Sequence, residues 1–155
     1  MQYFKYIIVS IISLSLSICA LADTPKNTAK IGGNEKISVF FNDNDKKFAA
    51  QYRDTQIKGD DIVVSIMFVN MSSDLSPDMR LPGNKHTKIR IDTYFKNNNT
   101  VIASKSVYPI DYYYQQEGYV RTGNSIPLYL HSGNINKKQL GSINTILIDP
   151  QLETK

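Results

Sequence analysis

The chain of 155 residues carries 18 basic and 14 acidic residues, a net charge of +4, and contains ten tyrosines, no tryptophan and a single cysteine. One cysteine excludes an intramolecular disulfide, and the two histidines, His86 and His131, lie far apart in the sequence and form no metal-binding motif. The basic doublets Lys46-Lys47 and Lys137-Lys138 are also far apart. We therefore expect no nucleic-acid-binding face.

Residues 1–22 have the features of a signal peptide. Lys5 precedes an apolar run over residues 6–18, and Ala20-Leu21-Ala22 places small residues at positions −3 and −1 of a cleavage site. The run is shorter than the ~20 residues that a bilayer requires, so we expect cleavage before Asp23 and no membrane span in the mature chain. Cleavage removes one lysine and the cysteine, leaving 133 residues with 17 basic and 14 acidic side chains, a charge of +3.

Cys19 raises the alternative of a bacterial lipoprotein. The residue before a lipidated cysteine is normally Gly, Ala or Ser, and Ile18 stands there instead. The abundance of Asn, Lys and Ile is typical of an AT-rich, bacterial coding sequence. We expect a periplasmic or secreted protein that is not anchored through Cys19.

The mature chain is expected to begin with a flexible tether over residues 23–36, because this polar segment with Pro25, Gly32 and Gly33 has no periodicity. From Ile37 the apolar residues repeat with period two, which indicates strands. The predicted strands cover residues 37–41, 48–53, 62–70, 87–96, 101–108, 119–120 continuing into 126–130, and 143–148. About seven short strands without a long helix predict an all-β, antiparallel, immunoglobulin-like sandwich, a single domain over residues 37–155.

The clearest alternation lies in residues 87–96, where apolar residues face one side and charged residues the other. Residues 96–100, Lys-Asn-Asn-Asn-Thr, then join this strand to the next in a hairpin. Residues 71–86 are long, rich in Pro and Ser and without period, and are either a functional loop or a mobile insertion.

VVSIMFVNMSSD followed by HTKIRIDTYFKNNNTVIASKSV resembles the central hairpins of small secreted immunoglobulin-like domains of the FxLYD type. The resemblance covers residues 62–107. The chain departs from the pattern at residues 97–99, where three asparagines replace an Asp-x-x-Gly-like turn, and in the long 71–86 loop. Such domains are usually structural or ligand-binding accessories of the envelope, so the resemblance implies an architecture rather than a reaction.

No motif supports catalysis, a metal site or a cofactor. Asp43 and Asp45 lack the spacing of an EF-hand, because Lys47 occupies the third acidic position. Ser132 follows His131 but lies in no Gly-x-Ser-x-Gly elbow. We expect no catalytic residue, no metal ligand and no cofactor.

The segment from Ile110 to Gly123 is the strongest candidate for a binding surface, because it has four tyrosines in eight positions, from Tyr112 to Tyr119. A tyrosine ring buries a large apolar area while its hydroxyl stays hydrogen-bonded, and few rotatable bonds are frozen on binding. Alternation along a strand would send Tyr112 and Tyr114 to one face and Tyr113 to the other. The competing interpretation is that Tyr108, Tyr112 and Tyr119 fill the core in place of tryptophan.

The sequence therefore predicts a non-enzymatic binding or assembly module that contacts an envelope or host protein. The predicted binding residues are Tyr112, Tyr113, Tyr114, Gln115, Gln116, Tyr119 and Arg121. A carbohydrate-binding domain is the alternative, with a ring stacked on a sugar and Asp111 bonding its hydroxyls. A glycoside hydrolase using Asp111 and Glu117 is the third hypothesis.

Overall fold

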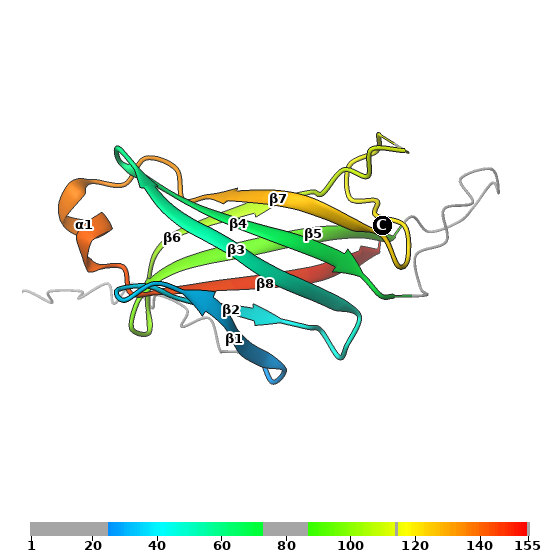
Figure 1. The fold of residues 1–155 in the computed structure, drawn as a ribbon, viewed down its shortest axis with the longest axis horizontal. Coiled ribbons are helices and arrows are strands. Elements are labelled where there is room, and N and C mark those ends of the chain that lie inside the picture. The colour runs from blue at the N-terminus through cyan, green and yellow to red at the C-terminus, as the bar shows by residue number, and fades with distance from the viewer. Residues whose placement is uncertain (1–24, 73–86, 114, 155) are drawn as a thin grey trace, which may run out of the picture.

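The computed structural model describes residues 25–72, 87–113 and 115–154, which form eight strands and one short helix in two sheets (Figure 1). The larger sheet has the strand order β1 (Thr28–Gly33), β2 (Ser38–Asn42), β8 (Thr145–Thr154), β5 (Thr87–Asn97) and β6 (Thr100–Val107). The smaller sheet has the order β3 (Phe48–Lys58), β4 (Asp61–Asn70) and β7 (Ser125–His131), and helix α1 covers Lys137–Ser142. The predicted all-β class with two sheets is confirmed.

Neighbouring strands are antiparallel except for β2 and β8, which run parallel. In Figure 1, β3 and β4 cross in front of β5 and β8, and the buried side chains of both sheets belong to one core. The chain changes sheets between β2 and β3, between β4 and β5, and on both sides of β7. Both connections that flank β7 therefore span the two layers at the ends of the molecule.

Period-two alternation produces this core as predicted. Ile89, Ile91, Thr93 and Phe95 of β5 are at most 1% exposed and face the smaller sheet, where Phe68 of β4 is fully buried. Burying one such side chain contributes roughly 1.5–3 kcal/mol. The even-numbered residues of β5 lie on the opposite, outer face of the five-stranded sheet.

The expected tether over residues 23–36 is wrong for Thr28–Gly33, which pairs with β2 as strand β1. Ile31 packs against the core, and Gly32 lies against the ring of Tyr52, where a Cβ would approach the ring Cγ to 2.2 Å. The glycines that indicated a turn are therefore needed for close packing. The sequence of β1 has no period-two alternation that would reveal a strand, because β1 is stabilised by pairing with β2 and by one apolar contact.

Other boundaries also differ from those predicted. Strand β8 continues through Pro150 to Thr154, and α1 was not predicted. Residues 119–120 form no strand, because only isolated bridges join Ile110 to Glu117 and Tyr119. Several of the predicted features lie outside the described residues. These are the signal peptide with Cys19, the 71–86 loop except for its first two residues, His86 and Tyr114.

Within the described ranges, no helix has the length and apolar character needed to cross a membrane.

Candidate functional site

The candidate site is the connection between β6 and β7, residues 108–124, which we call the tyrosine loop. Its described residues form turns and isolated bridges rather than a strand. The premise that alternation separates Tyr113 from Tyr112 is therefore wrong. Both rings are exposed, Tyr112 by 89% and Tyr113 by 72%.

The side chain of Asp111 holds the tyrosine loop together. Its carboxylate is fully buried and accepts hydrogen bonds from the backbone N–H groups of Tyr113 (2.9 Å) and Arg121 (3.1 Å). Asn124 Nδ2 donates to it at 2.9 Å, and Arg121 Nε donates at 3.1 Å. One carboxylate thus fixes residues that are up to 13 positions apart.

Burial alone would raise the pKa of Asp111, but the hydrogen bonds from Tyr113, Arg121 and Asn124 outweigh it and lower the pKa to about 2. Asp111 is therefore ionised at neutral pH and satisfied by donors of the loop itself. Its carboxylate is not presented to a sugar hydroxyl or a glycosidic bond in this arrangement. This argues against the role that the carbohydrate and glycoside hydrolase hypotheses give to Asp111.

The tyrosine loop is also attached to both sheets. Asn70 at the end of β4 is fully buried and donates from Nδ2 to the carbonyl of Val120 at 2.6 Å, while its own carbonyl accepts from Gly123 N at 2.6 Å. The Gly118 carbonyl accepts from Ile89 N of β5 at 2.8 Å. These bonds tie the loop to the ends of two strands and limit its freedom.

An aromatic surface results on the outside of the loop. Ile110 is 51% exposed, and the exposed rings of Tyr112 and Tyr113 follow it within three residues along the loop. The guanidinium of Arg121 lies over the Tyr113 ring with its Cζ 4.9 Å from the ring centroid. Arg121 therefore joins the buried carboxylate of Asp111 to an exposed ring.

The remaining predicted binding residues divide between surface and interior. Gln115 is exposed and has a left-handed backbone (φ 49°), whereas Tyr119 is 5% exposed and belongs to the interior. Gln116 is half-buried, and its Oε1 is buried without a hydrogen-bond partner among the described residues. The core-filling interpretation therefore fits Tyr119 and is wrong for Tyr112 and for Tyr108, which is 38% exposed.

The histidine and serine before the β7–α1 connection do not form a hydrolase triad. His131 Nδ1 lies 2.7 Å from Asp61 Oδ2, but the Ser132 hydroxyl donates to Asp61 Oδ1 at 2.9 Å instead of to the imidazole. Ser132 Oγ also accepts from Ile62 N at 2.9 Å. No group of His, Cys, Asp and Glu residues capable of holding a metal occurs in the described part of the chain.

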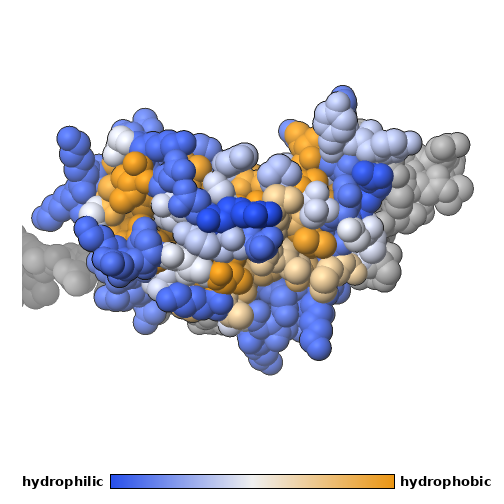
Figure 2. Space-filling view, in the orientation of Figure 1, coloured by the Kyte–Doolittle hydropathy of each residue, from blue (hydrophilic) through white to orange (hydrophobic). Residues whose placement is uncertain are grey.

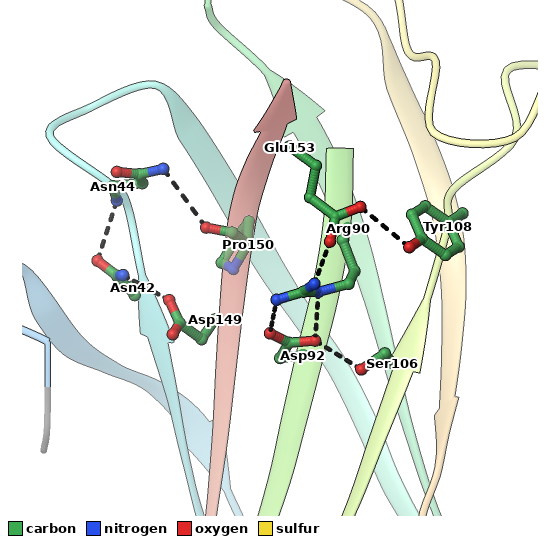
Figure 3. A network of polar contacts seen from close by, with 9 residues as sticks. All are labelled: Asn42, Asn44, Arg90, Asp92, Ser106, Tyr108, Asp149, Pro150 and Glu153. Carbon is green, nitrogen blue, oxygen red and sulfur yellow. Dashed lines mark hydrogen bonds and ion pairs between the residues drawn. The ribbon is translucent and has the colours of Figure 1, made fainter. Parts of the chain in front are cut away.

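A polar network on the outer face of the five-stranded sheet was not predicted (Figure 3). Arg90 binds both carboxylate oxygens of Asp92 at 2.9 Å and also pairs with Glu153. Ser106 of β6 donates to Asp92 at 2.6 Å, and the Tyr108 hydroxyl donates to Glu153 at 3.0 Å. The network joins β5, β6 and β8 to the beginning of the tyrosine loop.

Asp149 of β8 lies opposite Asp92 in the strand pairing and is almost as buried. Burial raises the pKa of Asp149, the negative charge of Asp92 raises it further, and a hydrogen bond from Asn42 Nδ2 (2.6 Å) opposes the rise. Alternation in β5 and β8 puts both residues on the outer face. Only the pairing register, which the sequence does not reveal, brings them together.

A comparison with protein-family models, with curated proteins and with solved structures finds no match to this chain.

Proposed function

We propose that this protein is a non-enzymatic, exported binding or assembly module that contacts a protein partner through the tyrosine loop. The observation that carries the proposal is the exposure of two adjacent rings, Tyr112 and Tyr113, on a loop fixed by the buried carboxylate of Asp111. Such rings offer large contact areas at low cost in side-chain entropy.

The hydrogen bonds that hold the tyrosine loop in place favour binding, because they reduce the entropy that is lost when a partner binds. Association requires loops and side chains to be ordered, which costs about 0.5–1.5 kcal/mol for each flexible side chain at an interface. The bonds of Asp111 and Asn70 order the backbone before any partner arrives. Tyr113 is further held by Arg121, so part of the ordering cost is already met in the free protein.

The outer face of the smaller sheet is a weaker candidate. Figure 2 shows its apolar surface in several separate areas interrupted by hydrophilic side chains. Tyr129 of β7 is 64% exposed there as a single ring. Scattered apolar residues are normal on a protein surface, whereas Ile110, Tyr112 and Tyr113 are close in sequence on one loop.

Site-specific photocrosslinking in the native envelope tests the proposal. A benzophenone amino acid replaces Tyr112 in one variant and Tyr129 in the other, so that a second exposed tyrosine serves as the matched control. We expect a discrete protein adduct from position 112 and none of that mass from position 129. Adding Tyr113→Ala to the position 112 variant should reduce the adduct severalfold.

The proposal fails if both positions give the same adducts. It also fails if Tyr112→Ala combined with Tyr113→Ala leaves the captured complex unchanged while the circular dichroism and melting temperature match those of the parent. Sequencing of the chain secreted by the native cell should begin at Asp23 if residues 1–22 are removed. An N-terminus at a lipidated Cys19 would contradict free export.

The immunoglobulin-like character of the sandwich is likewise proposed. The parallel pairing of β2 with β8 and the repeated changes of sheet favour a Greek-key arrangement of this kind. The strand order assigns β5 as the antiparallel neighbour of β8 on one side and β2 as its parallel neighbour on the other. Cross-strand backbone NOEs that paired β8 with strands other than β2 and β5 would overturn it.

Carbohydrate recognition is the second candidate function. The observation that favours it is the 89% exposure of the Tyr112 ring, a flat apolar surface on which the face of a sugar can stack. Exposed Gln115 supplies an amide nearby, whereas Asp111 does not contribute. A glycan array with no binding above background, together with the Tyr112 adduct to a protein, would exclude this function.

A further inference from the structure

A pocket lies on the outer face of the five-stranded sheet, apart from the tyrosine loop. Its volume is about 350 Å³, near the small end of the range for ligand sites. Its lining residues come from β1, β2, β5, β8 and the β5–β6 turn and are Thr28, Phe40, Lys96, Asn98, Asn99, Thr145 and Leu147. The polar network of Figure 3 lies on the same face, because Asn42 and Asp149 follow Phe40 and Leu147 by two residues on their strands.

The floor of the pocket is apolar. Phe40 and Leu147 are opposite each other in the parallel pairing of β2 with β8. Their neighbours along the strands belong to the core, so both side chains point outward, away from it. A ring and a branched alkyl group side by side favour an apolar ligand group.

Lys96 supplies the charge of the pocket. The residue as a whole is only 5% exposed, although it lies on the outer face, and its ammonium has no hydrogen bond or ion pair with any residue that the structure describes. Its ammonium nitrogen is not among the buried, unpaired side-chain atoms of the described residues, so the stem is buried while the charge keeps contact with solvent. No Asp or Glu is among the described residues that line the pocket, so the ammonium can accept an anion from outside.

The turn after Lys96 adds hydrogen-bond donors. Asn98 has a left-handed backbone (φ 51°) and accepts from Asn144 Nδ2 at 2.8 Å through its Oδ1. The backbone N–H of Asn98 donates to Asn144 Oδ1 at 2.9 Å, whereas the side-chain Nδ2 of Asn98 and the side-chain amide of Asn99 have no partner among the described residues. The asparagine-rich turn therefore places unused amide donors at the rim of the pocket beside Lys96.

We propose that this pocket binds a small amphiphilic carboxylate, with the carboxylate on Lys96 and the asparagine amides and the apolar group over Phe40 and Leu147. One cation suits one negative charge. The apolar floor distinguishes such a ligand from a small inorganic anion, which would leave Phe40 and Leu147 in water. This site is independent of the tyrosine loop, and its failure would leave the proposed function untouched.

The test is a titration of the full-length protein, labelled with ¹⁵N, with sodium octanoate. Octanamide keeps the alkyl chain without the charge, and acetate keeps the charge without the chain. We expect octanoate to give saturable shifts of the backbone signals of Asn98, Asn99 and Thr145. Octanamide and acetate should each bind at least about tenfold more weakly, because each lacks one of the two interactions.

Variants separate the charge from the shape of the pocket. Lys96→Met keeps most of the apolar stem and should weaken octanoate binding about tenfold without changing octanamide binding, and Lys96→Arg should retain octanoate. Lys58→Met, at an exposed lysine on the β3–β4 hairpin, should have no effect. The proposal is overturned if octanoate gives no saturable shift at these residues, if octanamide binds equally well, or if Lys96→Met binds octanoate like the parent.

Discussion

The carboxylate of Asp111 and the guanidinium of Arg121 form an ion pair whose acidic side chain is fully buried and whose basic side chain is 41% exposed. The same guanidinium lies over the ring of Tyr113. The pair therefore links the interior of the tyrosine loop to its exposed surface. The order of the proposed binding surface depends on a carboxylate that no partner can reach.

Asp111→Asn should destabilise the protein by roughly 1.5–3 kcal/mol at pH 7, because hydrogen bonds to a charged group are stronger than neutral ones. An amide keeps one acceptor oxygen but turns a donor group toward Arg121 and Asn124. Urea unfolding measures the change, with Asp60→Asn, an exposed carboxylate in the β3–β4 turn, as the control. A stability equal to that of the control would contradict the anchoring role.

The same substitution should remove part of the acid sensitivity of the protein. The pKa of Asp111 is lowered from 3.8 to about 2 in the folded state, so the unfolded chain takes up this proton first as the pH falls. Ionised Asp111 therefore contributes roughly 2 kcal/mol to the free energy of unfolding above pH 3.8, and this contribution is lost as the pH falls through about 2. The stability difference between parent and Asp111→Asn should therefore narrow from pH 5 toward pH 2. A difference that stays constant over this range would contradict the assignment.

The strands were predictable where the chain alternates by itself, as from Ile89 to Phe95, since period two is a local property. Strand β1 was not predictable, because Gly32 packs closely against Tyr52, a residue that belongs to the other sheet. The tyrosine loop was found from its composition, but its geometry depends on Asp111 contacts with residues 10 and 13 positions later. Such contacts leave no period in the sequence.

Gly118→Ala should destabilise the tyrosine loop more than Gly123→Ala. Both glycines have left-handed backbones (φ 79° and 78°), so an alanine costs roughly 1–2 kcal/mol at either position. At Gly118 the added Cβ would lie 2.8 Å from Lys88 Cβ and 3.2 Å from the Ile89 carbonyl, whereas at Gly123 nothing lies within 4 Å. Hydrogen exchange of Ile89 N–H, which is bonded to Gly118, should accelerate only in Gly118→Ala. Equal melting temperatures for the two variants would show that the contact with β5 is not restrictive.

Asp149→Asn should stabilise the protein at neutral pH, because Asp149 is buried opposite the negative charge of Asp92. Like charges on opposed strand residues destabilise a sheet by roughly 0.2–1 kcal/mol, and an asparagine oxygen still accepts the hydrogen bond from Asn42. Burial and Asp92 raise the pKa of Asp149 in the folded state. The stability that protonated Asp149 gives the folded state is therefore complete below pH 3.8. It is lost as the pH rises through the raised pKa of Asp149.

The gain in the free energy of unfolding from Asp149→Asn should accordingly appear above the raised pKa. It should vanish in acid, where Asp149 of the parent is protonated in both the folded and the unfolded state. Melting temperatures measured from pH 3 to pH 8 would follow it. Asp92→Asn is the matched control, and it should destabilise the protein because Asp92 accepts two hydrogen bonds from Arg90 and one from Ser106. If Asp149→Asn were less stable than the parent at pH 7, the raised pKa and the repulsion between the two carboxylates would both be refuted.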